Sequence, residues 1–164
     1  MRLAVISDTH LDEPTDWFRQ IFARHLLPAE ALIHCGDITG KAVLDFLSHN
    51  HPNFHAVAGN TCAWQTAQEL PAMLRLCLGG REVGVTHGWG DRGHVPAKVY
   101  EAFGPGLDLI LFGHTHRQFK MLFGQTLLVN PGSLCPDGEQ NPCLAFIDLG
   151  KDIAVEFRRL PPAV

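Results

Sequence analysis

The chain has 164 residues, of which 46% are hydrophobic and 18% charged, and a formal net charge of −4 at pH 7. This length suits one domain with one hydrophobic core, so we expect a single domain over residues 1–164, and the composition excludes a disordered or low-complexity chain. The acidic balance argues against a protein that binds nucleic acids through a basic surface.

The first half of the chain alternates short apolar runs with segments of helical periodicity. An apolar run that stops at a polar or glycine-containing turn is typical of a buried strand. The expected strands are 3–6, 31–34 and 54–58. Apolar residues at helical spacing, as in Trp17, Phe18, Ile21 and Phe22, predict helices that pack on a sheet. The expected helices are 14–27, 40–47 and 63–70.

The second half of the chain has a different pattern of elements, with one expected helix at 95–103 and several strands. Gly79-Gly80 predicts a hairpin between two of these strands. The expected strands are 73–78, 81–86, 107–112, 118–122, 126–129, 143–149 and 153–160. Strand–helix units followed by mostly antiparallel strands predict an α/β fold, a four-layer α-β-β-α sandwich of two facing mixed sheets.

Neither a membrane segment nor a disulfide framework is expected. The apolar run 3–6 is too short for a signal peptide, and no segment approaches the ~18 apolar residues of a membrane span. The five cysteines are odd in number and form no CxxC pair, so we expect reduced thiols in a cytoplasmic protein with no membrane partner. The sequence leaves a homo-oligomer open.

Residues of the types that ligate metals follow five of the expected strands. They are Asp8-Thr9-His10, Gly36-Asp37, Gly59-Asn60, His87-Gly88 and Gly113-His114-Thr115-His116. Each fragment alone is typical of a turn or cap, although the paired histidines are a stronger signal. Ligands bind beyond the carboxyl ends of strands in α/β sheets, so the series together predicts one metal site there. Imidazole ligands favour transition metals over magnesium or calcium.

The order DxH, GD, GN, HG, GHTH resembles the calcineurin-like metallophosphoesterase superfamily. The short chain and the segment Asn130-Pro131-Gly132-Ser133 resemble its small bacterial and archaeal phosphodiesterase branch. The resemblance implies a site for two divalent ions and a bridging hydroxide. The implied ligands are Asp8, His10 and His116 for the first ion, Asn60, His87 and His114 for the second, and Asp37 between both. Of these, the residues expected to act in catalysis are Asp37, Asn60, His87 and His114.

The expected ions are two Mn²⁺, with Ni²⁺, Fe²⁺, Zn²⁺ and Co²⁺ as alternatives. Two such ions, less two aspartates and one hydroxide, leave a formal charge of about +1, which suits an anionic phosphate. The expected activity is therefore hydrolysis of small phosphodiesters by in-line attack. A phosphomonoesterase or nucleotide phosphatase is one alternative, and a non-catalytic scaffold resembling the retromer subunit is another. Extended nucleic acid is not an expected partner.

The run Gly59-Asn60-Thr61-Cys62 departs from the pattern of the resembled family. Many relatives have a histidine where Thr61 stands, proposed as the acid that protonates the leaving group, and an acidic residue where Cys62 stands. Neither residue here is a good proton donor near neutral pH, and general acid catalysis contributes roughly 10²–10⁴-fold. We therefore expect a preference for good leaving groups. Cys62 is expected to be a structural thiol rather than an additional ligand.

Five further residues near the motifs have two interpretations each. Trp89 either stacks on a base or aryl group of a substrate or packs beneath a loop. Arg92 is expected on the surface, with a contact to the substrate phosphate as the alternative. His94 either caps the next helix or faces solvent. Asn130 and Ser133 are explained by turn chemistry, with support of the metal site as the alternative.

Overall fold

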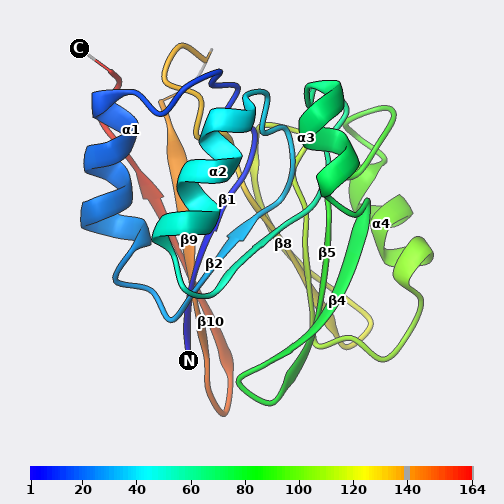
Figure 1. Ribbon diagram of the computed structural model, residues 1–164. Helices are drawn as coiled ribbons and strands as arrows, with labels where there is room; N and C mark the ends of the chain where they lie inside the picture. Colours follow the sequence, from blue (N-terminus) through cyan, green and yellow to red (C-terminus); the bar gives the residue numbers. More distant parts are fainter. Residues whose placement is uncertain (139–140, 164) are drawn as a thin grey trace.

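The computed structural model describes residues 1–138 and 141–163, so the expected domain 1–164 includes three residues, 139, 140 and 164, that lie outside the described part. Within that part, the strands form two sheets of five strands each (Figure 1). The strands are β1 (Arg2–Ile6), β2 (Ala31–His34), β3 (Phe54–Ala56), β4 (Met73–Leu78), β5 (Arg81–Thr86), β6 (Leu109–Leu111), β7 (Gln118–Phe123), β8 (Thr126–Pro131), β9 (Cys143–Leu149) and β10 (Ile153–Arg159). The helices are α1 (Asp16–Ile21), η1 (Phe22–Leu26), α2 (Lys41–Asn50), α3 (Trp64–Glu69) and α4 (Val95–Phe103).

Both sheets are mixed and each contains three neighbouring parallel strands. The first sheet has the order β10-β9-β1-β2-β3, in which β1, β2 and β3 are parallel and β9 and β10 are antiparallel to their neighbours. The second has the order β4-β5-β6-β8-β7, in which β5, β6 and β8 are parallel. The carboxyl ends of the parallel strands in a sheet therefore lie at one edge, where loops with functional residues are expected.

Alternation along the strands divides the apolar residues between two sides of each sheet. In β1, Leu3 and Val5 face the second sheet and share a cluster with Val83 and Leu109. Ala4 and Ile6 face the opposite way, toward the residues of α1, η1 and α2. The buried residues of α4 pack with those on the outer side of the second sheet. Figure 1 shows α1 and α2 on one side of the molecule and α4 on the other, which confirms the four-layer sandwich.

The segment expected to form one helix over 14–27 is the clearest departure from the predicted elements. It is an α-helix over α1 and then a π-helix over η1, in which the N–H of Leu27 donates to the carbonyl of Phe22. The wider turn keeps both Phe22 and Leu26 buried against the sheet, and Pro28 has no N–H with which to continue an α-helix. By contrast, α4 has the predicted bounds. Among the described residues, no helix has the length and apolar character needed to span a membrane.

Candidate metal centre

The loops that follow five strands bring the seven predicted site residues together at one edge of the sandwich. Asp8 and His10 follow β1, and Asp37 follows β2. Asn60 follows β3 after a short turn. The remaining three residues come from the second sheet, with His87 directly after β5 and His114 and His116 after β6.

One group of donor atoms is formed by Asp8, His10, Asp37 and His116. The Nε2 atom of His116 lies 3.1 Å from Oδ1 of Asp8 and 3.4 Å from Nε2 of His10. Nε2 of His10 lies 3.8 Å from Oδ2 of Asp37. One ligating atom from each of these four residues lies within 4.8 Å of the others. Two imidazoles and two carboxylates at this spacing can surround a single ion.

A second group is formed by Asn60, His87 and His114. Oδ1 of Asn60 lies 3.0 Å from Nε2 of His87 and 2.9 Å from Nδ1 of His114. Nε2 of His87 in turn lies 3.3 Å from Oδ2 of Asp37. Because the same Asp37 oxygen faces His10 in the first group, Asp37 stands between the two groups.

The buried carboxylate of Asp8 tests whether these residues fit a metal ion. Its Oδ1 atom is buried and makes no hydrogen bond with any described residue, although Nε2 of His116 lies only 3.1 Å from it. An unsatisfied buried acceptor is unfavourable by about 1–3 kcal/mol, so a cation is the natural partner for this atom. The imidazole nitrogens of His10 and His116 face the same point as the carboxylate. Oxygen and imidazole donors together fit a divalent transition-metal ion.

Five of the seven residues have a left-handed backbone. Their φ angles lie between +48° and +66°, and no other non-glycine residue in 1–138 or 141–163 has a positive φ. The five are Asp8, His10, Asp37, His114 and His116. This conformation costs roughly 1–2 kcal/mol at each non-glycine residue, and such strain clusters at functional sites.

Three glycines beside the site permit close backbone approach. A Cβ atom at Gly36 would collide with the ring of His87, and one at Gly59 would collide with the carboxylate of Asp37. A Cβ atom at Gly113 would collide with Ser7 and with the backbone after β2. The glycines next to the ligand-type residues are therefore required by packing.

Asn130 and Ser133 form hydrogen bonds with the loops that carry the site residues. The Nδ2 group of Asn130 donates to the carbonyl of Gly113 at 2.6 Å and to Oγ1 of Thr115 at 3.0 Å, and its Oδ1 accepts from the N–H of Gly132 at 2.9 Å. The hydroxyl of Ser133 donates to the carbonyl of Asp8 at 2.8 Å. The same side chains therefore form the turn and hydrogen-bond to the loops that carry Asp8, His114 and His116, so support of a metal site stays a prediction.

Thr61 holds two of the seven residues, a role that the sequence did not reveal. Its N–H donates to Oδ1 of Asp37 at 2.8 Å, and its hydroxyl lies 3.3 Å from Nδ1 of His10. The Sγ atom of Cys62 accepts from the N–H of Gly59 at 3.2 Å, as a structural thiol would. Only the three-dimensional contact reveals the role of Thr61, because nothing in the residue type signals it.

Burial and hydrogen bonding shift the pKa values of three groups at the site. Burial alone would raise the pKa of Asp37, but hydrogen bonds from His87 and Thr61 hold it well below its usual range. Burial alone would lower the pKa of His87, but Asp37 and the charge of Asp8 raise it. Burial lowers the pKa of His34 to about 3. Its neutral ring accepts from the N–H of Gly36 and contacts the hydroxyl of Thr9, both at 3.2 Å.

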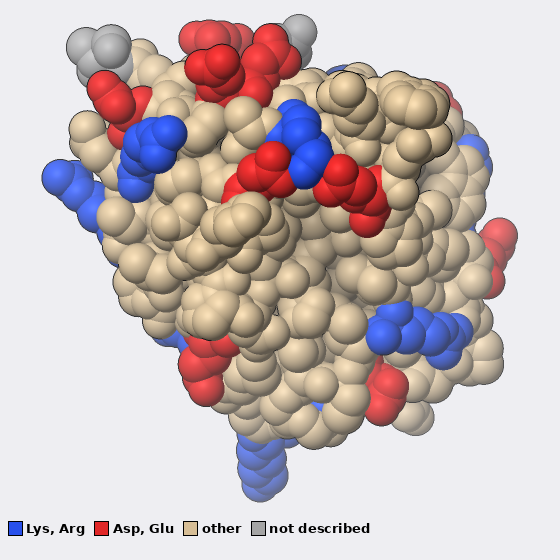
Figure 2. All heavy atoms as spheres, in the orientation of Figure 1, with Lys and Arg blue, Asp and Glu red and all other residues tan. Residues whose placement is uncertain are grey.

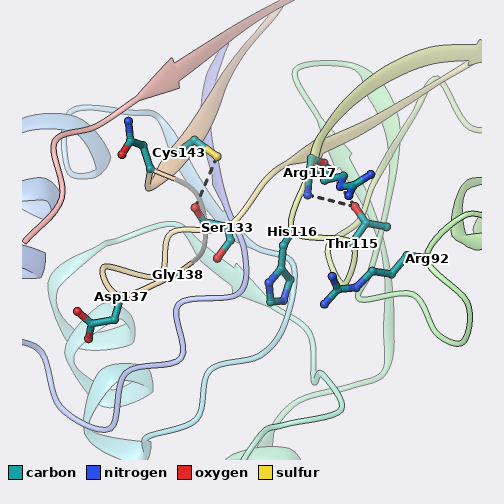
Figure 3. Close-up of a pocket in the computed structure, with 9 residues that line it drawn as sticks. Arg92, Thr115, His116, Arg117, Ser133, Asp137, Gly138 and Cys143 are labelled. Carbon is teal, nitrogen blue, oxygen red and sulfur yellow. Dashed lines mark hydrogen bonds between the residues drawn. The ribbon is translucent and has the colours of Figure 1, made fainter.

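A cavity adjoins each end of the site. The first, of about 300 Å³, is lined by His116, Arg92 and Arg117 among others (Figure 3). The second, of about 160 Å³, is lined by Asn60, His87 and Trp89.

Exposure and cavity lining bear on the two interpretations of Trp89, Arg92 and His94. The side chain of Trp89 is 45% exposed and lines the second cavity, so it is not packed beneath a loop. Arg92 is exposed, as expected, but it also lines the first cavity. His94 precedes α4 without a side-chain cap and lies on the surface beside Asp91.

Comparisons with known proteins agree with this geometry. Residues 1–152 match the model of the calcineurin-like phosphoesterase superfamily domain. The chain is 31% identical to a probable metallophosphoesterase of Methanocaldococcus jannaschii, over 98% of this chain and 81% of that protein. Its fold is similar to that of Chaetomium thermophilum Vps29, with a TM-score of 0.74 and 18% identity over 99% and 100% of the two chains. A structure described as a novel archaeal phosphodiesterase has a TM-score of 0.73 and 21% identity over 96% and 100%.

Proposed function

Because the chain belongs to the calcineurin-like phosphoesterase superfamily, we propose that it is a phosphodiesterase that hydrolyses small phosphodiesters at a site for two divalent ions. The family supports a metal-dependent phosphoesterase. The observation that supports a site for two ions is the position of Asp37, whose Oδ2 atom faces His10 of one donor group and His87 of the other. One carboxylate shared between two donor groups is an arrangement that fits a two-metal site.

In this proposal, Asp8, His10 and His116 hold one ion, Asn60, His87 and His114 hold the other, and Asp37 contacts both. Bound divalent ions would supply Lewis-acid stabilisation of phosphate charge and a water of lowered pKa as the nucleophile. We propose manganese first because the carboxylate and amide oxygens suit it. The four imidazoles suit nickel, iron and zinc, which stay alternatives together with cobalt.

The chain itself contributes orientation and charge. Thr61 fixes Asp37 and His10, and Asn130 fixes the turn that carries His114 and His116. The lowered pKa of Asp37 keeps its carboxylate ionised, as a metal ligand must be. The histidines ligate only when neutral, so protons compete with metal ions in acid.

Two observations support a diester substrate with a good leaving group. A phosphodiester carries two ester arms, and a cavity adjoins each end of the site, one beside His116 and one beside Asn60. The hydroxyl of Thr61 contacts His10, and the thiol of Cys62 accepts a hydrogen bond from the N–H of Gly59, so neither side chain serves as a general acid in this proposal. Without a general acid, which contributes roughly 10²–10⁴-fold, departure of an arm depends on its own stability as an anion.

A metal-screened assay tests the proposal. We expect hydrolysis of bis(p-nitrophenyl) phosphate with Mn²⁺, weaker hydrolysis of p-nitrophenyl phosphate, and loss of both in His114→Ala. The matched control is His49→Ala, which removes an exposed histidine of α2. A preference for the monoester would make the protein a phosphatase, and equal activity of wild type and His114→Ala would identify a contaminant.

A scaffold is the second candidate, and the similarity to Vps29 favours it. A pure protein that hydrolyses neither ester with any of the five metals would establish this candidate over the first. We also propose a cytoplasmic location and small substrates. On the face shown in Figure 2, blue and red side chains are interspersed among uncharged surface, which gives no support to an extended nucleic-acid partner.

A further inference from the structure

The cavity beside His116 contains two arginines. It has a volume of about 300 Å³ and is bordered by Arg92, Arg117, Ser133 and Asp137. Figure 3 shows the side chain of Arg92 extending toward His116, whereas Asp137 lies on the other side of His116 and Ser133. The positive charge is therefore at one end of the cavity and the negative charge at the other.

Within residues 1–138 and 141–163, neither of the two guanidinium groups forms an ion pair. Arg2, Arg81 and Arg158 each form an ion pair with a carboxylate. By contrast, no carboxylate of the described residues lies within 4.0 Å of the guanidinium groups of Arg92 or Arg117. A guanidinium has five N–H donors in a planar fork that binds carboxylate or phosphate oxygens in pairs. No carboxylate of the described residues therefore competes with an anion that enters the cavity for these two groups.

Both arginines also line another cavity. A neighbouring cavity of about 280 Å³ shares Arg92, Thr115 and Arg117 with the first and is otherwise lined by residues such as Phe112 and Phe119. The arginines thus lie between a polar space that begins at His116 and a more apolar space beyond it. Neither arginine belongs to the two donor groups of the candidate metal centre, so both are available to a second part of the substrate.

We propose that the substrate carries a second anionic group on one ester arm, a carboxylate or phosphate, and that Arg92, assisted by Arg117, binds it in this cavity. The inference rests on the proposed function, because the scissile phosphate has to lie at the metal centre for the arm to reach Arg92. Asp137 repels an anion from its own end of the cavity, so the group is directed to the arginines.

Three p-nitrophenyl propyl phosphodiesters test this inference, with a propyl arm that ends in a carboxylate, a hydroxyl or a trimethylammonium group. The leaving group is the same in all three, so differences report binding of the arm. With Mn²⁺, we expect kcat/KM of wild type to be about tenfold higher for the carboxylate than for the hydroxyl, and lowest for the cation. In Arg92→Gln the carboxylate preference should fall below about twofold, mainly through KM. The matched control is Arg24→Gln, which removes an exposed arginine of η1 and should keep the preference.

An equilibrium measurement separates the inference from the reaction. Isothermal titration of the Mn²⁺-loaded protein with the 3-carboxypropyl and 3-hydroxypropyl esters of methylphosphonic acid requires no turnover. Tighter binding of the carboxylate ester by wild type, lost in Arg92→Gln, supports the inference even if no diester is hydrolysed. Equal binding of both esters overturns it, even if bis(p-nitrophenyl) phosphate is a good substrate. Absence of hydrolysis alone contradicts only the proposed function.

Discussion

The side chain of Asn130 gives the most direct test of how the chain holds its metal centre. Its Nδ2 group donates to the carbonyl of Gly113 and to Oγ1 of Thr115, and its Oδ1 accepts from the N–H of Gly132. The side chain is fully buried. Asn130→Asp keeps the acceptor for Gly132 but removes both donors, so it leaves the turn intact and releases the loop that carries the two histidines.

The expected effect follows from these contacts. Each lost hydrogen bond is worth about 0.5–1.5 kcal/mol, and the buried Gly113 carbonyl left unsatisfied adds about 1–3 kcal/mol. The new carboxylate is also buried beside the Gly113 carbonyl, where it stays charged without a partner or takes up a proton, so we expect Asn130→Asp to lower the free energy of unfolding by at least about 3 kcal/mol. Loss of groups that orient metal ligands typically lowers metal affinity by about 10–100-fold, and we expect a change of that size for Mn²⁺.

Urea unfolding of the metal-free protein and isothermal titration with Mn²⁺ measure the two effects separately. The matched control is Asn53→Asp, which alters a half-buried amide that donates to the carbonyl of Glu30 away from the site. We expect wild-type metal affinity in this control. If Asn130→Asp folds cooperatively and binds Mn²⁺ as tightly as wild type, Asn130 does not position the histidine loop, and the argument is wrong.

Three further predictions concern packing, acid and the aromatic cavity. Gly59→Ala should lower Mn²⁺ affinity at least tenfold in a titration, because its Cβ collides with Asp37, whereas Gly150→Ala has free space and should not. The free energy of unfolding should fall by on the order of 4 kcal/mol between pH 7 and pH 3 through His34 alone, because burial lowers its folded pKa to about 3 and the unfolded chain binds a proton below about pH 6.5. Urea unfolding at several pH values should therefore give a shallower pH dependence for His34→Gln, and equal slopes would contradict this. Trp89→Ala should raise the inhibition constant of the phenyl ester of methylphosphonic acid about three- to tenfold and leave that of the methyl ester less affected, because only the phenyl arm can stack on Trp89 in the second cavity; an equal change for both would exclude stacking.

The parts of the molecule that the sequence predicts are those encoded locally. The ends of β1, β2 and β5 are visible because an apolar run meets Asp or His, and parallel strands then place these ends at one edge. The helix α4 has its predicted bounds because its apolar spacing ends at Gly104. The break between α1 and η1 is not encoded in the same way, since apolar spacing does not distinguish an α-turn from a wider π-turn.

The contacts that refine the site depend on segments distant in sequence, so residue types alone do not predict them. Thr61 reaches Asp37 across 24 positions, and Asn130 reaches Gly113 across 17. Arg92 is an ordinary exposed arginine in the sequence, and it gains a role only because the loop before α4 lies beside the loop that carries His116. The spacing of residues along the sequence does not show which distant segments come into contact.

The backbone strain at the site connects the locally encoded strand ends with the contacts between distant segments. Asp8, Asp37 and His114 have left-handed backbones that the chain would not adopt on its own, so their positions have to be maintained by neighbours. The N–H of His10 donates to the carbonyl of Asp37, and the N–H of His114 donates to Oδ2 of Asp8, so strained residues are joined to each other by hydrogen bonds. The site is therefore held in shape by the protein itself, which is the condition under which two donor groups can share one carboxylate at close range.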